Sequence, residues 1–421
     1  MQMITVNELF SGIGAFRKAL ERLNIPHKII GISEIDEHAI NSYEAIFGAT
    51  RNYGDISRVN KLDYADMWTY GFPCQDISIC GQQAGIIKGE TRSGLLYEVQ
   101  RLLVSAALLD ELPRYLILEN VKNLVGKKFK NDFHSWLEWL SAMGYHNYWQ
   151  VINAKDCGIP QNRERVFVVS IRKDIDEGFS FPEKIPLTIT MHDLSETEVE
   201  EKFYPPPTIF DSSEFDEALM VSDAKASLAK CIGGIGEKKS NGGKQYYQQD
   251  RVYAGDIALA HPAQITGGSY YYAIKEPRDK NAPWISSKGV KYILSPKRGM
   301  CTDVNADIIQ PLTAKGQSNW TGSFVSPDIE TLEKHTTIGG TEPVKIKLKN
   351  GETITSDDDV SHLRIRRLTP RECWRLMGFD DTDFEKAEKV CSNSQLYKQA
   401  GNSIVVNVLM GILNNLLGGD S

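Results

Sequence analysis

One cysteine stands directly after a proline in the stretch GFPCQDIS, residues 71–78. Pro73 restricts the backbone ahead of Cys74, and the residues before them read as a short strand, Asp66–Tyr70. A cysteine that serves only packing is more often found within an apolar run. A thiol on a rigid turn at the tip of a strand is typical of a nucleophile, so Cys74 is the first candidate catalytic residue.

A carboxylate and two arginines accompany other predicted strands. Glu119 ends the strand in LILENV, and QNRERV precedes a further strand with Arg163 and Arg165 on one face by alternation. Ligands of an open parallel sheet bind outside the carboxyl ends of its strands. We therefore expect these side chains to meet Cys74 at one sheet edge, although each one alone is more often a surface ion pair.

A glycine-rich turn and two acids indicate a cofactor site. Gly12 and Gly14, in SGIG, follow the first predicted strand and open a helix, where they permit close backbone approach to a ligand. The third glycine of a dinucleotide fingerprint is missing, which disfavours a pyrophosphate. Glu34 ends the second strand, where an acid can bind both ribose hydroxyls, and Asp55 is placed for an adenine amino group. The set predicts an adenosine cofactor without a pyrophosphate; the alternative is a structural turn with solvated acids.

Alternating strands and helices must position these residues. Residues 1–172 alternate short apolar runs with helical patterns over Ser93–Leu109 and Asn131–Met143, which predicts an α/β fold with a Rossmann-like, mostly parallel, doubly wound sheet. The predicted strands are Ile4–Phe10, Lys28–Ser33, Asp66–Tyr70, Tyr115–Glu119, Asn147–Asn153 and Val166–Ile171.

The middle of the chain has a different pattern. Residues 180–360 are rich in Gly, Ser, Tyr and Pro, with strand-like pieces such as QQDRVYAG, GSYYYAIK and EPVKIKLKNGETI, and KNGE at 349–352 is a hairpin signal. Helical patterning returns over 363–421. We expect a catalytic and cofactor-binding domain of residues 1–180, completed by 392–421, and a second, smaller, irregular β-rich domain of residues 181–391.

Composition sets the class of protein. The chain has 421 residues, 41% hydrophobic and 24% charged, as in ordinary globular proteins. Its seven cysteines form no CxxC pair and its eight histidines are dispersed, so we expect neither a disulfide framework nor a metal site. The N-terminus lacks the pattern of a secretory signal and no apolar stretch reads as a membrane span, so we expect a cytoplasmic protein without membrane contact.

The charge is unevenly distributed. The net charge is −7, but residues 174–217 alone carry −11, which leaves +4 for the remainder. Basic clusters lie at 126–130, 295–299 and 364–375. They are compatible with a polyanionic partner, although the charge balance does not require one.

At these motifs the sequence resembles the C5-cytosine DNA methyltransferase family, in particular its bacterial and phage members of the restriction-modification type. The motifs cover residues 4–172 and 363–410 in family order. They are FSGIGAF, GFPCQ, ENV, QNRERV, RRLTPRECWRLMGF and QAGNSIVVNV.

The resemblance implies an S-adenosylmethionine-dependent methyltransferase core, base flipping and a covalent adduct between Cys74 and C6 of cytosine. Glu119 would bond N3 and the exocyclic amine, Arg165 would hold O2, and Arg163 would support that geometry or a nearby phosphate. The residues expected to bind the cofactor are Phe10, Gly12, Gly14, Glu34, Ile35, Asp55, Ile56, Pro73, Leu95, Asn402 and Ser403.

Double-stranded DNA is the implied macromolecular partner. Residues 75–92 read as a glycine-rich loop able to close over the base, and the arginines of RIRRLTPRECWR could position the recognition domain or touch phosphates. The DNA-binding candidates are Ser78, Arg92, Lys244, Arg251, Thr266 and Arg367. We expect a monomer, and a cognate restriction endonuclease is compatible with the resemblance.

Two other functions remain open from the sequence. One is a tRNA cytosine methyltransferase with a related core; the long variable zone of this chain favours reading DNA instead. The other is a non-catalytic DNA-binding or regulatory protein descended from an enzyme, against which the presence of Cys74, Glu119 and Arg165 argues.

Overall fold

The chain divides into two compact units. The computed structural model describes residues 2–72, 92–203 and 368–418, together with short strands between residues 204 and 367. Unit 1 comprises Met1–Ile189, Pro262–Gln264 and Cys373–Ser421, and unit 2 comprises Thr190–His261 and Ile265–Glu372. Unit 1 thus joins the two ends of the chain. It takes in the C-terminal segment from Cys373, whereas the sequence placed this boundary at residue 392.

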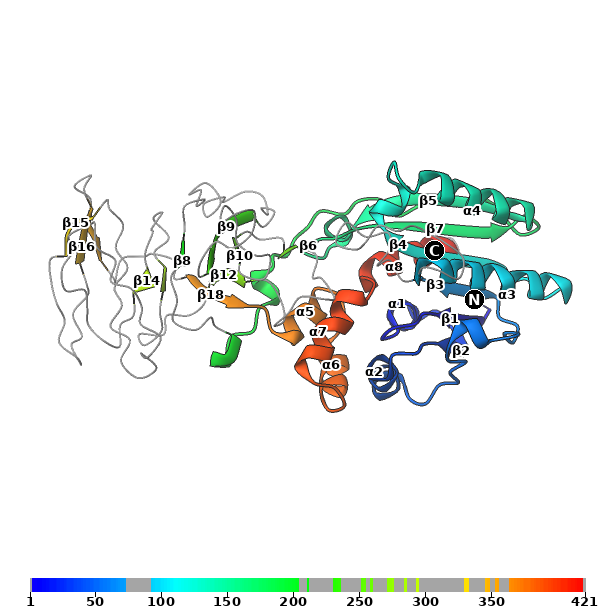
Figure 1. Ribbon diagram of the computed structural model, residues 1–421, viewed down its shortest axis with the longest axis horizontal. Coiled ribbons are helices and arrows are strands. Elements are labelled where there is room, and N and C mark those ends of the chain that lie inside the picture. The colour runs from blue at the N-terminus through cyan, green and yellow to red at the C-terminus, as the bar shows by residue number, and fades with distance from the viewer. Residues whose placement is uncertain are drawn as a thin grey trace. The chain divides into compact units, whose positions relative to one another are not determined.

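Unit 1 is built on a six-stranded sheet of order β2-β1-β3-β4-β7-β5 (Figure 1). Neighbouring strands from β2 to β4 are parallel, and β7 is antiparallel to both β4 and β5. The six predicted strands are confirmed, with ends shifted by one or two residues. Their bounds are β1 Ile4–Leu9, β2 His27–Ser33, β3 Met67–Tyr70, β4 Tyr115–Val121, β5 Tyr145–Asn153 and β7 Glu164–Arg172.

Helices follow most of these strands and confirm the α/β pattern. The helices of the first part of unit 1 are α1 Ala15–Arg22, α2 Glu37–Phe47, α3 Leu96–Leu108 and α4 Lys130–Ala142. Its short elements are η1 Ile56–Arg58, η2 Arg92–Leu95, η3 Lys122–Val125, η4 Ala154–Cys157 and β6 Gln161–Asn162. The later helices are α5 Pro370–Arg375, α6 Asp381–Glu388, α7 Asn393–Asn402 and α8 Val406–Leu417.

Burial on both faces explains the apolar sequences of the central strands. All four residues of β3, MWTY, are buried, whereas the edge strand β5 is buried only at its first and eighth residues. Trp68 and Tyr70 point into a core shared with α3 and α4. Met67 and Ile117 are fully buried without belonging to that core, so the opposite face is covered too. The sheet is therefore doubly wound, as predicted.

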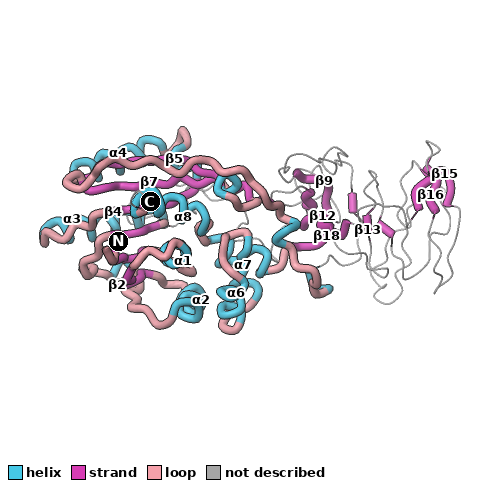
Figure 2. The backbone as a smooth tube through the Cα atoms, turned by 180° about the vertical axis from the view of Figure 1, so that it is seen from behind, coloured by secondary structure: helices cyan, strands magenta, loops and turns pink. Residues whose placement is uncertain are grey.

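The C-terminal helices complete unit 1. α8 packs against α1, which lies near the other end of the chain (Figure 2). The segment Asn393–Leu417 is long and apolar enough to cross a membrane by composition, but half of its most apolar window is buried. Its backbone also leaves the helix between α7 and α8. We interpret it as a core segment of unit 1.

Unit 2 contains a seven-stranded sheet of order β14-β13-β18-β12-β10-β9-β8 and a three-stranded sheet of order β15-β16-β17. The predicted pieces are confirmed as strands, and β16 and β17 pair antiparallel on either side of KNGE. That unit 2 is a smaller domain that recognises the target stays a prediction. The bounds are β8 Phe210–Asp211, β9 Lys230–Ile235, β10 Arg251–Ala254, β11 Ala258–Leu259, β12 Tyr271–Lys275, β13 Trp284–Ile285, β14 Ile293–Leu294, β15 Ile329–Leu332, β16 Lys345–Leu348, β17 Thr353–Thr355 and β18 Leu363–Arg367; the short helices η5 His192–Leu194 and η6 Glu201–Phe203 precede them.

Candidate active site

Four strands of unit 1 end in one row. Leu9 pairs with Ser33 on one side and Tyr70 on the other, and Tyr70 pairs with Leu118. Because these strands are parallel, the next residue of each lies at the same edge of the sheet. The residues in this next row are Phe10, Glu34, Gly71 and Glu119. The strand ends that carry Phe10, Glu34 and Glu119 therefore lie at one edge of the sheet, and the meeting of Cys74 with them stays a prediction.

The β1–α1 turn has a backbone that few residues adopt. Phe10, Gly12 and Gly14 all have positive φ, at 56°, 54° and 83°. A side chain at Gly14 would lie 2.7 Å from the ring of Tyr43, so only glycine fits there. Left-handed geometry at Phe10 is costly for a residue with a Cβ, and such strain concentrates at ligand-binding sites. The space beside Gly12 is open for at least 4 Å.

Glu34 is fastened to this turn through its carboxylate. Oε2 accepts a hydrogen bond from the Gly12 amide at 2.9 Å, and Oε1 accepts from the amides of Ile35 and Asp36 at 2.8 and 2.9 Å. A carboxylate has about four lone-pair positions, so capacity for a further donor remains on Oε2. The Ile35 side chain beside it is 72% exposed, an unusual position for a large apolar residue. The acid and an uncovered apolar surface thus lie together.

The other cofactor candidates of this edge differ in how accessible they are. Asp55 accepts from the Ser57 amide and hydroxyl at 3.0 and 2.8 Å, and these bonds lower the pKa of its carboxyl. Ile56 is 3% exposed and belongs to the core, which leaves its backbone as the part able to meet a ligand. Leu95 is partly buried against the same core.

A buried acid beneath the turn was missed by the sequence reading. Glu8 on β1 is 1% exposed and accepts hydrogen bonds from the Tyr43 hydroxyl at 2.5 Å and the Arg17 amide at 3.1 Å. Loss of hydration raises its pKa from 4.5 to about 7, against the effect of both bonds. Glu8 therefore joins β1, α1 and α2. Its only signal in the sequence was an acid inside an apolar strand.

Glu119 and Arg165 form the ion pair at the centre of this edge. Arg165 Nε lies 3.1 Å from Glu119 Oε1, and the two side chains are 19% and 13% exposed. The contact depends on the reversed direction of β7, which places its first residues beside the last residues of β4, with Val121 opposite Arg165. Desolvation raises the pKa of Glu119, and the charges of Arg165 and Arg163 act in the opposite direction.

Asn120, the next residue, holds the segment that leads to the cysteine. Its Nδ2 donates to the carbonyl oxygen of Phe72 at 3.0 Å, and both residues are 2% exposed. Its Oδ1 accepts from the Val121 amide at 2.9 Å. The sequence reading used the ENV motif only for its acid. An amide has donors and an acceptor, and that capacity was the available signal.

Arg163 connects two motifs that are far apart in the sequence. Its side chain is buried, and one terminal nitrogen donates to the carbonyl oxygens of Gly401 and Ser403 at 2.9 and 2.8 Å. Ser403 is 7% exposed and Asn402 is exposed. Arg163 thus fixes the end of α7, where the sequence placed the methionine end of the cofactor, and this favours support of the geometry over a phosphate contact.

Several predicted residues cannot be placed. Pro73, Cys74, Ser78, Lys244 and Thr266 lie outside the described residues. Arg92 and Arg251 are described only by their backbones in η2 and β10.

The arginines of RIRRLTPRECWR are largely held by acids. Arg366 is fully buried and makes two hydrogen bonds with Glu372, at 2.7 and 2.8 Å, so it cannot reach a phosphate. Arg375 pairs with Asp381 at 2.6 Å. That these arginines position the recognition domain stays a prediction. Arg367 is partly exposed and stays a DNA-binding candidate.

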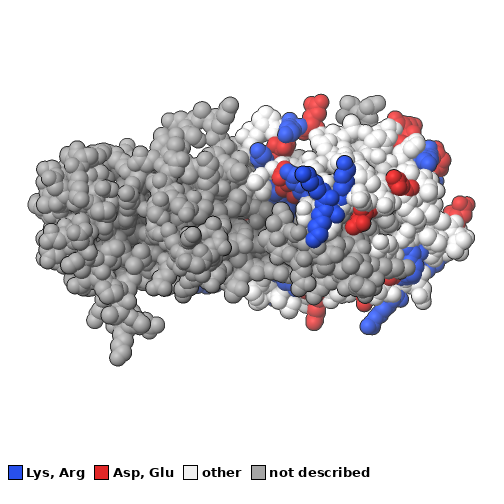
Figure 3. Space-filling view, turned by 45° about the horizontal axis from the view of Figure 1, so that its top comes forward, with Lys and Arg blue, Asp and Glu red and all other residues white. Residues whose placement is uncertain are grey.

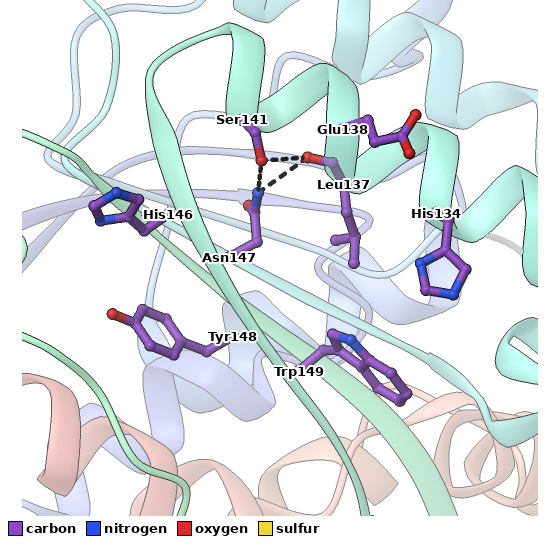
Figure 4. Close-up of a pocket in the computed structure, with 8 residues that line it drawn as sticks. All are labelled: His134, Leu137, Glu138, Ser141, His146, Asn147, Tyr148 and Trp149. Atoms are coloured by element: carbon purple, nitrogen blue, oxygen red, sulfur yellow. Dashed lines mark hydrogen bonds between the residues drawn. The ribbon is translucent and has the colours of Figure 1, made fainter.

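A cavity of about 380 Å³ lies elsewhere, between α4 and β5 (Figure 4). Asn147 projects into it and donates to Ser141 Oγ and to the carbonyl oxygen of Leu137, at 2.9 and 3.0 Å. None of the predicted site residues lines it. Within the described part of the chain, no group of three or more His, Cys, Asp or Glu could hold a metal ion.

Comparisons with known proteins agree with these motifs. The profile of the C-5 cytosine-specific DNA methylase family matches residues 4–418. The chain is 31% identical over 470 residues to the type II methyltransferase M2.ScrFI of Lactococcus lactis subsp. cremoris, covering 98% of this chain and 99% of that protein. It is 30% identical over 510 residues to the orphan methyltransferase M.Rho11sI of Bacillus phage rho11s, covering 99% and 98%.

Solved structures show the same fold. The methyltransferase EhMeth of Entamoeba histolytica superimposes with a TM-score of 0.58 at 16% identity, covering 99% of both chains. The Dnmt2 methyltransferase of S. pombe gives a TM-score of 0.53 at 17% identity, covering 99% of this chain and 98% of that one. Since the profile spans nearly the whole sequence and its relatives match along their full length, the chain belongs to the C-5 cytosine-specific DNA methylase family.

Proposed function

We propose that this protein is a sequence-specific DNA methyltransferase that moves a methyl group from S-adenosylmethionine to C5 of a flipped cytosine, through a covalent adduct between Cys74 and C6. The observation that supports it best is the Glu119–Arg165 ion pair. It lies in the same row of strand ends as Gly71, which leads to Cys74, and Glu34, which holds the glycine turn.

Cys74 is the nucleophile in this proposal. Cytosine C5 is a poor nucleophile, but addition of the thiolate to C6 pushes electron density onto C5. C5 then takes the methyl group and loses its proton to a base, and the C6–sulfur bond breaks to free the thiolate. The sequence singles out no side chain as that base, and a water molecule can serve equally well. The bond from Asn120 to the Phe72 carbonyl fixes the backbone from which Cys74 follows.

Glu119 and Arg165 act on the ring in complementary ways. Because burial raises the pKa of Glu119, its carboxyl keeps a proton more readily than an exposed acid and can donate it to N3 while charge develops. N3 returns this proton to Glu119 when the C6–sulfur bond breaks. The Arg165 guanidinium, already beside Glu119, holds O2. Preorganised partners of this kind contribute roughly 3–4 kcal/mol each in other enzymes.

The described residues fit an adenosine-type cofactor. The left-handed turn from Phe10 to Gly14 admits close backbone approach, Glu34 Oε2 keeps acceptor capacity for one ribose hydroxyl, and Ile35 offers an uncovered apolar surface for the adenine face. S-adenosylmethionine would supply an electrophilic methyl group on a sulfonium. Asn402 is exposed and Ser403 is held by Arg163, so this segment of the chain is fixed for the methionine end.

We assign the reading of DNA sequence to the domain of residues 181–391, and within it to residues 230–325. Lys244, Arg251 and Thr266 belong to stretches of the sequence rich in residue types able to contact base edges or phosphates. Residues 75–92 would close over the flipped base, with Ser78 and Arg92 on phosphates. A monomer without membrane contact satisfies this scheme, and the restriction-modification relatives suggest a cognate endonuclease as a genetic partner.

The test is a methylation assay on two nucleic acids. Purified protein with tritium-labelled S-adenosylmethionine is expected to label duplex DNA and not tRNA. Bisulfite sequencing of DNA from expressing cells is expected to place the methyl group on cytosine in one sequence context. Label on tRNA alone would support the RNA-directed alternative, and label on neither would support the non-catalytic one.

A further inference from the structure

The segment that follows the catalytic strand is strongly basic. Residues 122–130, KNLVGKKFK, contain four lysines and no acid in a chain whose net charge is −7. All four lysines, Lys122, Lys127, Lys128 and Lys130, are exposed. Lys and Arg side chains gather on this side of unit 1, the side that carries α4 and β5 (Figure 3). We call these four residues the lysine patch.

The backbone of the patch is firmly anchored. Leu124 and Phe129 are each 2% exposed and pack in the core shared with α3 and α4. The amides of Phe129 and Lys130 both donate to the Gly126 carbonyl, at 3.1 and 3.0 Å. The apolar residues thus point inward and the lysines outward from an ordered support.

The patch adjoins the candidate active site. Lys122 comes three residues after Glu119, just beyond the end of β4. It pairs with Glu164 at 2.8 and 2.9 Å, and Glu164 is the neighbour of Arg165. The lysines therefore begin at the sheet edge where the flipped base is proposed to bind.

The fold itself gains little from these charges. Lys130 is the first residue of α4, which has no side-chain hydrogen bond at its N-cap, Phe129. Cations at the N-terminus of a helix oppose its dipole. Asp132 is the acid of the first turn, and the exposed Lys122–Glu164 pair contributes little to stability because solvent screens it. Removing these lysines should leave stability unchanged or slightly higher.

We infer that the lysine patch binds DNA phosphates beside the flipped cytosine, and so forms a sequence-independent part of the DNA surface within the catalytic unit. The inference rests on the proposed function. DNA is favoured over an acidic protein because the patch continues from the sheet edge assigned to the base. Such contacts add affinity for every sequence and release counterions.

The experiment compares two variants of equal charge change. Lys127→Gln/Lys130→Gln removes two patch lysines. Lys28→Gln/Lys61→Gln removes two exposed lysines near the amino ends of β2 and β3, at the opposite edge of the sheet. Binding of the full-length proteins to a labelled mixed-sequence duplex and to tRNA is measured by anisotropy over a range of salt concentrations. Melting temperatures and DNA methylation are recorded alongside.

We expect the patch variant to reduce the slope of log affinity against log salt by about 0.9 per lost contact, or roughly tenfold in affinity per contact near 0.1 M salt. The control variant should keep the wild-type slope. If both variants and the wild type show the same slope of log affinity against log salt, while the wild type methylates DNA, the inference about the lysine patch is wrong. The proposed function would then stand. A reduced slope for tRNA but not for DNA would overturn the inference in favour of an RNA partner. Wild-type protein that neither binds nor methylates DNA would overturn the proposed function as well.

Discussion

Asn120 donates a hydrogen bond to the carbonyl oxygen of Phe72, and this bond links the end of the catalytic strand to the backbone two residues before Cys74. Asn120 lies in β4, Phe72 follows the end of the neighbouring parallel strand β3 by two residues, and both side chains are buried. The residue after Glu119 is therefore hydrogen-bonded to the described backbone that precedes Cys74.

Asn120→Ala should lower kcat more than it weakens cofactor binding, since it frees the Phe72 carbonyl and the turn after it. Loss of a buried bond costs about 1–3 kcal/mol of stability. Single-turnover kinetics, cofactor calorimetry and denaturation measure the three effects. Asn147→Ala, which removes donors to Leu137 and Ser141 away from the site, is the control and should affect stability only. Equal losses of kcat in both variants would contradict the positioning role.

Arg163→Ala should raise KM for S-adenosylmethionine, because the carbonyls of Gly401 and Ser403 lose their common donor. Arg163→Lys should raise KM less than Arg163→Ala does, since a single ammonium can still donate to one or both carbonyls. The control is Arg172→Ala, at the far end of β7, which loses a bond to the Leu112 carbonyl. If KM stays at the wild-type value while kcat falls, Arg163 acts on the base rather than on the cofactor end.

The pH dependence of catalysis should report Glu119. Its pKa is raised by burial, and its proton is needed at N3, so kcat/KM should fall as pH rises through that pKa. Arg165→Gln removes a charge that lowers this pKa, and it should move the alkaline limb to higher pH while it reduces the maximum rate. A limb that moves to lower pH, or one that persists in Glu119→Gln, would assign it to another group.

Glu8 should make folding stability fall as pH rises. Its folded pKa is about 7, above the ordinary 4.5, so between these values the native state binds more protons than the unfolded state. Stability from this group is full below pH 4.5 and is lost towards pH 7, by about 3 kcal/mol in all. Glu8→Gln should abolish this pH-dependent part of the stability. In urea unfolding, the difference in the free energy of unfolding between the variant and wild type should therefore vary with pH. Tyr43→Phe should shift the loss to higher pH, because the Tyr43 bond lowers the pKa of Glu8. A difference between Glu8→Gln and wild type that is constant over this range would show that Glu8 does not titrate there.

Cys74→Ser should abolish methyl transfer without changing the melting temperature, because the hydroxyl is close in size but a far weaker nucleophile. DNA containing 5-fluorocytosine should trap the wild-type protein covalently, since fluorine cannot leave C5 as a proton. Peptide mapping locates the adduct, and Cys80→Ser serves as the control. An adduct on Cys80, or methylation by Cys74→Ser near the wild-type rate, would assign the reaction to a different nucleophile.

Local patterns were enough to predict much of this arrangement. The strands up to Glu119 are predicted by apolar runs and by the turn residues that bound them. The parallel arrangement of these strands brings Gly12 close to Glu34 by topology alone. The direction of β7 is not encoded in its apolar run, because a buried strand reads the same in either sense. The bond from Arg163 to Gly401 spans 238 residues, so no local pattern predicts it. The protonation of Glu8 depends on packing from three elements.

The pairing of α1 with α8 has a consequence for how the protein is made. Translation releases α1 long before it releases α8. The surface of α1 that α8 covers therefore stays exposed while the chain between them is synthesised. Contacts of such sequence separation slow folding and prolong the exposure of apolar surface. A ribosome-bound fragment that contains every catalytic motif up to QNRERV still lacks the donor-site segment at Asn402. In our scheme such a fragment therefore has no complete donor site.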